Sequence, residues 1–158
     1  MGLSLWCDSI NTRVGSYSQV HIERRKMIEA AIKYLENEAE NIELKEELKN
    51  WISDERSDTE IKYNNISDKP SKLLIKNNLE GLHYFVNHSD NEGYLTPDES
   101  VQILNTLNKI INYLEYNYIN EESRLDKIDD GIDNKVKKHY LYKILIYSIK
   151  NKKNIEYH

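Results

Sequence analysis

The chain has 158 residues, a length that fits one domain with its own hydrophobic core. Hydrophobic residues make up 39% of it and charged residues 31%, and no run of 18 apolar residues predicts a transmembrane helix. Residues 1–7 contain neither a basic residue nor a long apolar stretch, so we expect no secretory signal. Cys7 is the single cysteine, which excludes an intramolecular disulfide. We therefore predict a cytoplasmic protein with no membrane contact.

The formal net charge is −5, but the charges are unevenly distributed. Residues 36–60 carry ten acidic and three basic side chains, whereas residues 135–158 carry seven lysines and one glutamate. A nucleic-acid-binding domain usually has a dominant basic face. Here the lysines are confined to the end of the sequence, where they suit a solvated surface that complements the acidic segment. We therefore expect no nucleic-acid partner.

The first predicted elements are a short strand and a long helix. Residues 3–7 alternate between apolar and polar, apart from Trp6, which favours a strand. Residues 11–18 are rich in Asn, Gly and Ser and predict a loop. A helix then begins near Gln19, and its apolar positions recur at three- and four-residue steps as far as residue 42. A second helical stretch covers residues 44–52.

The rest of the chain is predicted to hold an internal polar linker at 53–71, three further helices and a flexible tail at 151–158. The three helices are predicted from their apolar stripes, over residues 71–87, 96–114 and 134–150. Thr96, Pro97 and Glu99 form the pattern of a capping box with proline at the first helical position. These elements predict a mainly α fold, a single-domain bundle of four to five helices with an optional short N-terminal strand pair.

The loop from His88 to Glu99 has the layout of a calcium-binding EF-hand loop. With Gly93 at the sixth position, Asp90 and Glu92 fall at positions three and five and Glu99 at position twelve. The first position departs from the pattern, because calcium prefers a carboxylate there and imidazole suits a transition metal. Two readings stay open: a degenerate EF-hand-like module that binds Ca²⁺ or Zn²⁺ through His88, Asp90, Glu92 and Glu99, and a turn in which Glu99 only caps the next helix.

A polar cluster surrounds the predicted start of the first helix, where backbone amides and the helix dipole favour an anion. Serine hydroxyls can donate to phosphate, arginine can bind it bidentately, and tyrosine can stack on a base. In the alternative reading the serines cap the helix, and the arginines lie on an exposed face and pair with Glu23 or Glu29. The candidate ligand-binding residues are Ser16, Tyr17, Ser18, His21, Arg24, Arg25, His88, Ser89 and Asp90.

Several motifs together resemble a small family of phage and giant-virus accessory proteins. They are Met1-Gly2-Leu3-Ser4-Leu5, then Ser16-Tyr17-Ser18 with His21 and Arg24, and finally Gly81-Leu82, Phe85-Val86 and His88-Ser89-Asp90 with Gly93. The resemblance implies that residues 16–25 and 88–93 form one site across the core. It also implies a protein that acts in the host cytosol by binding, either capturing a host signalling nucleotide or blocking a host defence protein.

We therefore expect a non-enzymatic binder of a small anionic, nucleotide-like ligand. The alternatives are the metal-binding module and a helical module that inhibits a host protein through residues 36–60 or 135–153. No nucleophile has a recognisable base, and no spacing pairs two carboxylates, so an enzyme is not expected. No cofactor is predicted beyond Ca²⁺ or Zn²⁺ at the loop, and the sequence leaves homo-oligomer formation open.

Overall fold

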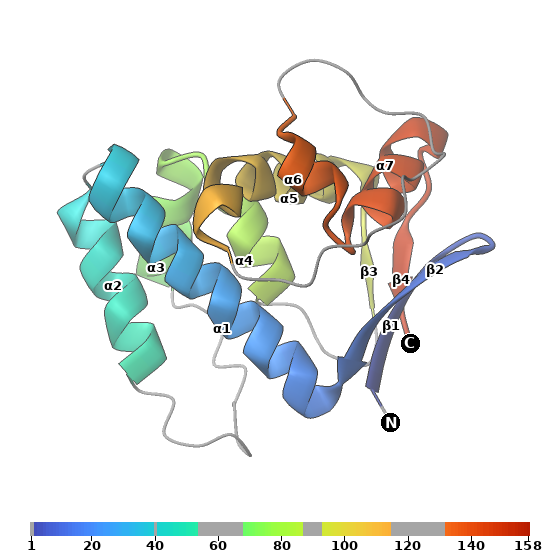
Figure 1. Ribbon diagram of the computed structural model, residues 1–158, viewed down its shortest axis with the longest axis horizontal. Helices are drawn as coiled ribbons and strands as arrows, with labels where there is room; N and C mark the ends of the chain where they lie inside the picture. The colour runs from blue at the N-terminus through green and yellow to red at the C-terminus, as the bar shows by residue number, and fades with distance from the viewer. Residues whose placement is uncertain (1, 40, 54–67, 87–92, 115–131) are drawn as a thin grey trace.

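A computed structural model describes residues 2–39, 41–53, 68–86, 93–114 and 132–158 (Figure 1). Within these ranges the chain forms seven α-helices, one π-helical and one 3₁₀ segment, and a four-stranded antiparallel sheet. The sheet lies at one end of the group of helices (Figure 1). The fold is therefore α+β, and the prediction of a mainly α bundle of four to five helices is wrong. Of the predicted linker at 53–71, residues 54–67 lie outside the described residues.

The sheet joins the two ends of the described chain. Its strands are β1 (Gly2–Cys7), β2 (Ile10–Ser16), β3 (Tyr94–Leu95) and β4 (Ile155–Tyr157), in the spatial order β2-β1-β4-β3. Leu5 pairs with Tyr157, and Leu95 pairs with Ile155. The strand β4 is thus central, although the sequence analysis assigned no element to residues 151–158. A segment of three residues is too short to show the apolar–polar alternation of a strand, so β4 is defined only by its pairing with distant strands.

The sheet has one buried face and one exposed face, as strand alternation requires. Trp6 and Tyr94 point outward, with 40% and 56% of their surface exposed. The helix α7 (Tyr142–Asn151) contacts β1 and β2. The buried strand residues are Leu3, Leu5, Cys7, Val14, Leu95, Ile155 and Tyr157.

The strand β2 corrects the prediction of a loop over residues 11–18. Its residues are rich in Asn, Gly and Ser, which are typical of loops, but its backbone pairs with β1 from Cys7 to Gly2. The register shifts between Leu3 and Ser4, and Gly15 opposite Leu3 has a φ of +136°, which glycine adopts readily. The turn-like residues therefore accommodate an irregular strand.

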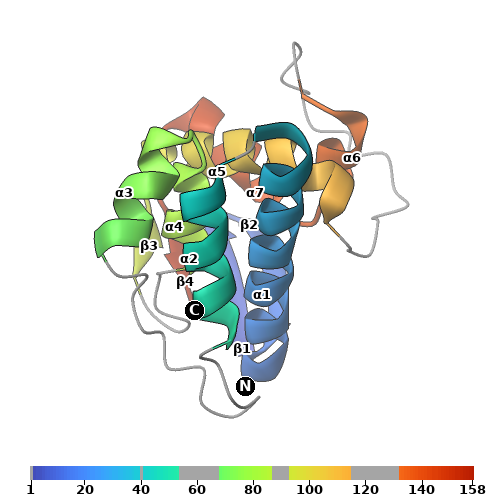
Figure 2. The same cartoon turned by 90° about the vertical axis from the view of Figure 1, so that its left-hand side faces the viewer.

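The helices α1 (Tyr17–Tyr34) and α2 (Ile42–Ser53) run side by side in opposite directions (Figure 2), with the π-helical segment Leu35–Ala39 between them. Ser16 is the N-cap of α1, and its side chain accepts a hydrogen bond from the backbone of Gln19. The predicted apolar face is largely confirmed, since Ile28, Ala31, Ile32 and Leu35 are buried. Ile42, predicted on that face, is 71% exposed.

The predicted helix over residues 71–87 is two helices, α3 (Asp68–Lys76) and α4 (Glu80–Val86). Asn78 lies between them with a left-handed φ of +58°. Its amide donates to the carbonyl of Ile75, and the amide of Leu79 donates to the carbonyl of Leu74. These two bonds form a Schellman motif, which ends a helix and is compatible with asparagine at the left-handed position.

The helix α5 (Pro97–Ile110) begins where the sequence predicted. Thr96 accepts a hydrogen bond from the Glu99 amide at 3.2 Å, and Glu99 accepts one from the Thr96 amide at 3.0 Å. The capping box is therefore confirmed, with Pro97 at the first position. A 3₁₀ segment, Ile111–Tyr113, follows α5.

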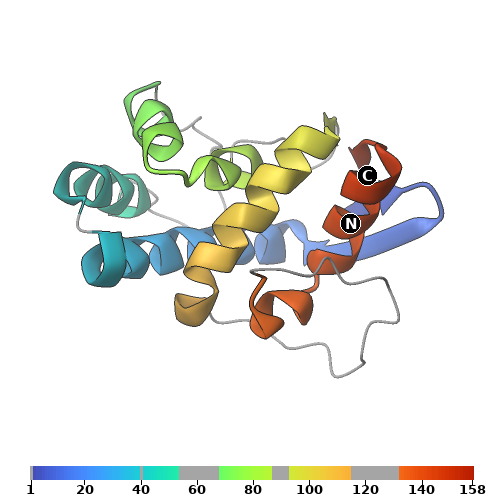
Figure 3. The ribbon, with the colours of Figure 1, turned by 90° about the horizontal axis from the view of Figure 1, so that it is seen from above.

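The predicted helix over 134–150 is also divided, into α6 (Asn134–Lys137) and α7. Between them the Leu141 amide donates to Nδ1 of His139 at 3.1 Å. A side chain thus takes the place that a helix carbonyl would have, which favours a turn over a continuous helix. Figure 3 shows α5 crossing the molecule between α4 on one side and α6 and α7 on the other.

The core gathers residues from the sheet and from every α-helix named above, and α6 contributes only Val136 to it. Gly81 in α4 lies so close to α5 that a Cβ atom there would be 2.1 Å from the carbonyl oxygen of Gln102. None of the helices in the described ranges is long and apolar enough to span a membrane.

Candidate functional site

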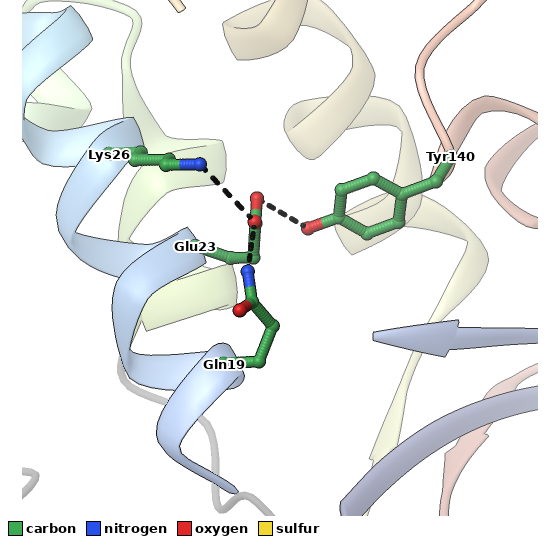
Figure 4. Close-up of polar contacts among 4 residues, drawn as sticks. All are labelled: Gln19, Glu23, Lys26 and Tyr140. Carbon is green, nitrogen blue, oxygen red and sulfur yellow. Dashed lines mark hydrogen bonds and ion pairs between the residues drawn. The ribbon is translucent and has the colours of Figure 1, made fainter. Parts of the chain in front are cut away.

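A buried carboxylate on α1 gathers polar side chains around it (Figure 4). Glu23 is only 8% exposed. Its Oε1 accepts a hydrogen bond from Nε2 of Gln19 at 2.7 Å and lies 3.8 Å from Nζ of Lys26. Its Oε2 accepts a hydrogen bond from the hydroxyl of Tyr140 at 3.4 Å. The carboxylate therefore links α1 to the turn between α6 and α7.

Helical spacing explains how Glu23 is surrounded. Gln19 is four residues before it and Lys26 three residues after it, so all three side chains lie on one face of α1. Tyr140 approaches from the chain beyond α6, and its ring is partly buried against the core. Burial raises the pKa of Tyr140 well above its usual value, and the negative charge of Glu23 raises it further. Tyr140 therefore stays a neutral hydrogen-bond donor to the carboxylate.

Arg24, the next residue on α1, is 2% exposed and points to a different part of the interior. Its guanidinium carbon lies 5.8 Å from the centre of the Phe85 ring, a cation–π distance. Tyr157 in β4 is also close, because Arg24 lowers the pKa of its hydroxyl while burial, the larger effect, raises it. A planar cation with several N–H donors is therefore held where α1, α4 and β4 meet.

His139 lies beside Tyr140 and is 2% exposed. Its ring stacks on the Tyr140 ring, with centroids 4.3 Å apart. Burial lowers the pKa of His139 to about 3. The geometry agrees, because Nδ1 accepts the Leu141 amide and so carries no proton. His139 is thus a neutral, structural side chain.

The two cationic residues predicted at the start of the first helix have different surroundings. Arg25 forms an ion pair with Glu29 at 3.2 Å, and its side chain is 43% exposed, as the alternative reading expected. Arg24 is buried, contrary to that reading. Ser16 is used as the N-cap of α1. The backbone of Tyr17, Ser18 and His21 belongs to α1, but their side chains lie outside the described part of the structure.

The second predicted cluster comes before β3 in the sequence. His88, Ser89, Asp90 and Glu92 lie outside the described residues. Glu99, the fourth candidate metal ligand, is the capping-box partner of Thr96. In the ranges that the structure describes, no group of three or more His, Cys, Asp or Glu side chains could hold a metal ion.

One of the two described segments that flank positions 87–92 contacts Arg24. Phe85, on the N-terminal side, contacts its guanidinium. Gly93, on the C-terminal side, accepts a hydrogen bond from the amide of Tyr157 at 3.0 Å, and Tyr157 is within electrostatic range of Arg24. Arg24 therefore contacts the helix that precedes the second predicted cluster, while Gly93, on the other side, is bonded to the backbone of Tyr157.

Three residues around the buried charges of α1 were not predicted from the sequence: Glu23, Tyr140 and Tyr157. Glu23 was considered only as an exposed partner for an arginine, and Tyr157 fell in the predicted tail. A charged pair at adjacent helix positions within an apolar stripe, Glu23 and Arg24 followed by Met27 and Ile28, was the available signal. It could have shown that both charges face the interior.

Comparison of the chain with protein-family models, with curated proteins and with solved structures finds no match in any of the three. The resemblance to phage and giant-virus accessory proteins therefore stays a prediction based on the short motifs named above.

Proposed function

We propose that the protein is a non-enzymatic binder of a small anionic, nucleotide-like ligand, and that Arg24 meets the negative charge of that ligand. One observation carries the proposal: the Arg24 guanidinium is buried on α1 beside Phe85 of α4, the helix that precedes the predicted cluster at residues 88–90 in the chain. Guanidinium is the side chain best suited to bidentate binding of phosphate or carboxylate. In this proposal the protein captures the ligand, and a host signalling nucleotide is the kind of ligand that would be captured.

The burial of Arg24 has a kinetic consequence under this proposal. Because only 2% of the residue is exposed, a ligand reaches the guanidinium only after neighbouring groups have moved. Association that requires such a rearrangement is slower than about 10⁵ M⁻¹ s⁻¹, the low end of ordinary association rates. Stopped-flow binding with a ligand found by screening would show this slow step.

The test is a thermal-shift and calorimetric screen with linear and cyclic adenine and guanine nucleotides, at concentrations well above micromolar. We expect at least one of them to raise the melting temperature, because a ligand that binds only the folded state stabilises it. A complete absence of shift would refute the proposed function.

Arg24 and its neighbour Arg25 provide a matched pair for the second part of the test. Arg24→Lys keeps the charge but loses the fork of donors, and we expect about tenfold weaker binding or more. Arg25→Lys alters an exposed ion pair and should leave binding unchanged within about twofold. Equal effects of the two substitutions, in proteins shown to be folded by circular dichroism, would contradict the role of Arg24.

A further inference from the structure

A second polar feature lies on the outward face of α5, where it meets the corner between α3 and α4. A hollow of about 330 Å³ is lined there by Asn78, Gln102, Asn105, Asn108 and Lys109. The lining contains four carboxamides and one ammonium, and no carboxylate, aromatic ring or apolar side chain. Pockets for drug-like small molecules are mostly apolar, so this lining suits a different kind of ligand.

The hollow has a fixed geometry. Nζ of Lys109 donates to the carbonyl of Asn78 at 2.8 Å, which fastens the α3–α4 corner to α5. On another side, Oδ1 of Asn108 accepts the amide of Asp133 at 2.7 Å, which fastens the residue before α6. Beneath it, the close approach of Gly81 to the backbone of Gln102 leaves no room for α4 to shift. The walls of the hollow are therefore set by backbone contacts of three segments.

Two side chains in this hollow are not needed by the fold. The side chains of Gln102 and Asn105 make no hydrogen bond or ion pair with any other residue in the described ranges. Asn105 is exposed and Gln102 is partly exposed, so both amide groups are accessible. Each amide offers two N–H donors and one carbonyl acceptor. That combination is complementary to a peptide unit, which presents one acceptor and one donor.

The spacing along α5 fits an extended chain. Gln102, Asn105 and Lys109 follow each other at three- and four-residue steps, which places them on one face of the helix. At 1.5 Å per residue, the row is about 10 Å long. An extended peptide advances about 3.3 Å per residue, so the row covers about three peptide residues. The Lys109 ammonium at one end would attract a carboxylate.

We propose that this amide-lined hollow binds an extended peptide segment that carries an acidic side chain. Gln102 and Asn105 hydrogen-bond to the main chain of the peptide, and Lys109 pairs with its carboxylate. The proposal is independent of the Arg24 site, because it depends on different residues and a different class of ligand.

The experiment is an NMR titration of the full chain, labelled with ¹⁵N, using three blocked tetrapeptides. The probe is N-acetylated, C-amidated alanine-aspartate-alanine-alanine. The first comparison peptide has asparagine for aspartate, and the second carries N-methyl groups that remove its N–H donors. We expect the probe to shift the side-chain amide signals of Gln102 and Asn105 with a Kd on the order of 1 mM. The asparagine peptide should bind several-fold more weakly, and the N-methylated one should not bind.

Substitutions then locate the site. Asn105→Ala and Gln102→Ala should each weaken binding about three- to tenfold, the usual effect of losing one or two hydrogen bonds. Asn154→Ala, an exposed asparagine just before β4, is the matched control and should have no effect. The absence of any shift with the probe would overturn the proposal. The proposal would also be overturned if Asn154→Ala weakened peptide binding as much as the two site substitutions, or if the N-methylated peptide bound as well as the probe. A shift of the same side-chain amide signals by the sugar maltotriose, equal to that caused by the probe, would overturn it too.

Discussion

Glu23 on α1 and the pair Gln102 and Asn105 on α5 differ in where their side-chain hydrogen bonds go. On α1, Glu23 accepts hydrogen bonds from Gln19 and Tyr140, forms an ion pair with Lys26 and is shielded from solvent. On α5, Gln102 and Asn105 face a hollow and make no hydrogen bond or ion pair with the other described residues. A polar group that the fold uses is expected to affect stability when it is removed, whereas one that the fold does not use is available for a ligand. The predictions below test that distinction.

The largest effect is expected for His139, next to the α1 cluster. Its pKa is about 3 in the folded protein because of burial, against about 6.5 in the unfolded chain. Between these values only the unfolded state binds the proton, so His139 stabilises the fold above pH 6.5. That contribution falls by about 1.4 kcal/mol per pH unit as the pH is lowered towards 3.

Urea unfolding followed by tryptophan fluorescence from pH 7 to pH 4 would measure this loss. His139→Gln should give a shallower dependence on pH over the same range, since glutamine does not titrate. Parallel curves for the two proteins would show that His139 does not titrate differently on folding.

The second effect concerns the backbone beneath the α5 hollow. Gly81→Ala would place a Cβ atom 2.1 Å from the Gln102 carbonyl oxygen and 2.5 Å from Cα of Ile103, and neither backbone atom can move aside alone. We expect the free energy of unfolding to fall by about 3 kcal/mol, as in other overpacked interiors. In an uncrowded helix the same change would stabilise by about 1 kcal/mol, so an increase in the urea midpoint would contradict the close approach of α4 to α5.

The smallest effects are expected from substitutions that compare Glu23 on α1 with Asn105 on α5. Glu23→Ala removes the acceptor of Gln19 and Tyr140 and should cost about 1–3 kcal/mol. Glu29→Ala, on the same helix, removes only an exposed ion pair, and Asn105→Ala removes no described contact; each should change stability by less than about 0.5 kcal/mol. The distinction between the clusters fails if Asn105→Ala destabilises as much as Glu23→Ala, measured by the same urea titration.

Local signals in the sequence predicted local structure well. The capping box of Thr96 and Glu99 satisfies both of its hydrogen bonds within four residues, so nothing distant is needed to define it. Of the apolar stripe that predicted a helix over residues 71–87, Leu74, Leu79, Leu82 and Phe85 are buried, whereas Ile75 is 50% exposed. What the spacing did not reveal is that Asn78 ends one helix between Leu74 and Leu79, because a Schellman turn keeps both leucines in the core.

Features that depend on distant partners were missed for a physical reason. The strand β4 is defined by pairing with β1 and β3, which lie far from it in the sequence, so its own three residues carry little periodicity. The candidate site was predicted in part, because Arg24 was selected but its burial was not. Burial of a charged helix residue depends on what packs over it, here Phe85 and Tyr157.

The central position of β4 has a consequence for how the protein folds. The hairpin of β1 and β2 and the paired helices α1 and α2 involve near neighbours in the chain, so they can form early and fast. The strand β3 joins β1 only through β4, so closure of the sheet requires contact between distant parts of the chain, which carries the largest loop-closure entropy. We therefore expect the sheet to be completed in the slow phase of folding, and a ribosome-bound chain to keep an open sheet until Tyr157 has emerged.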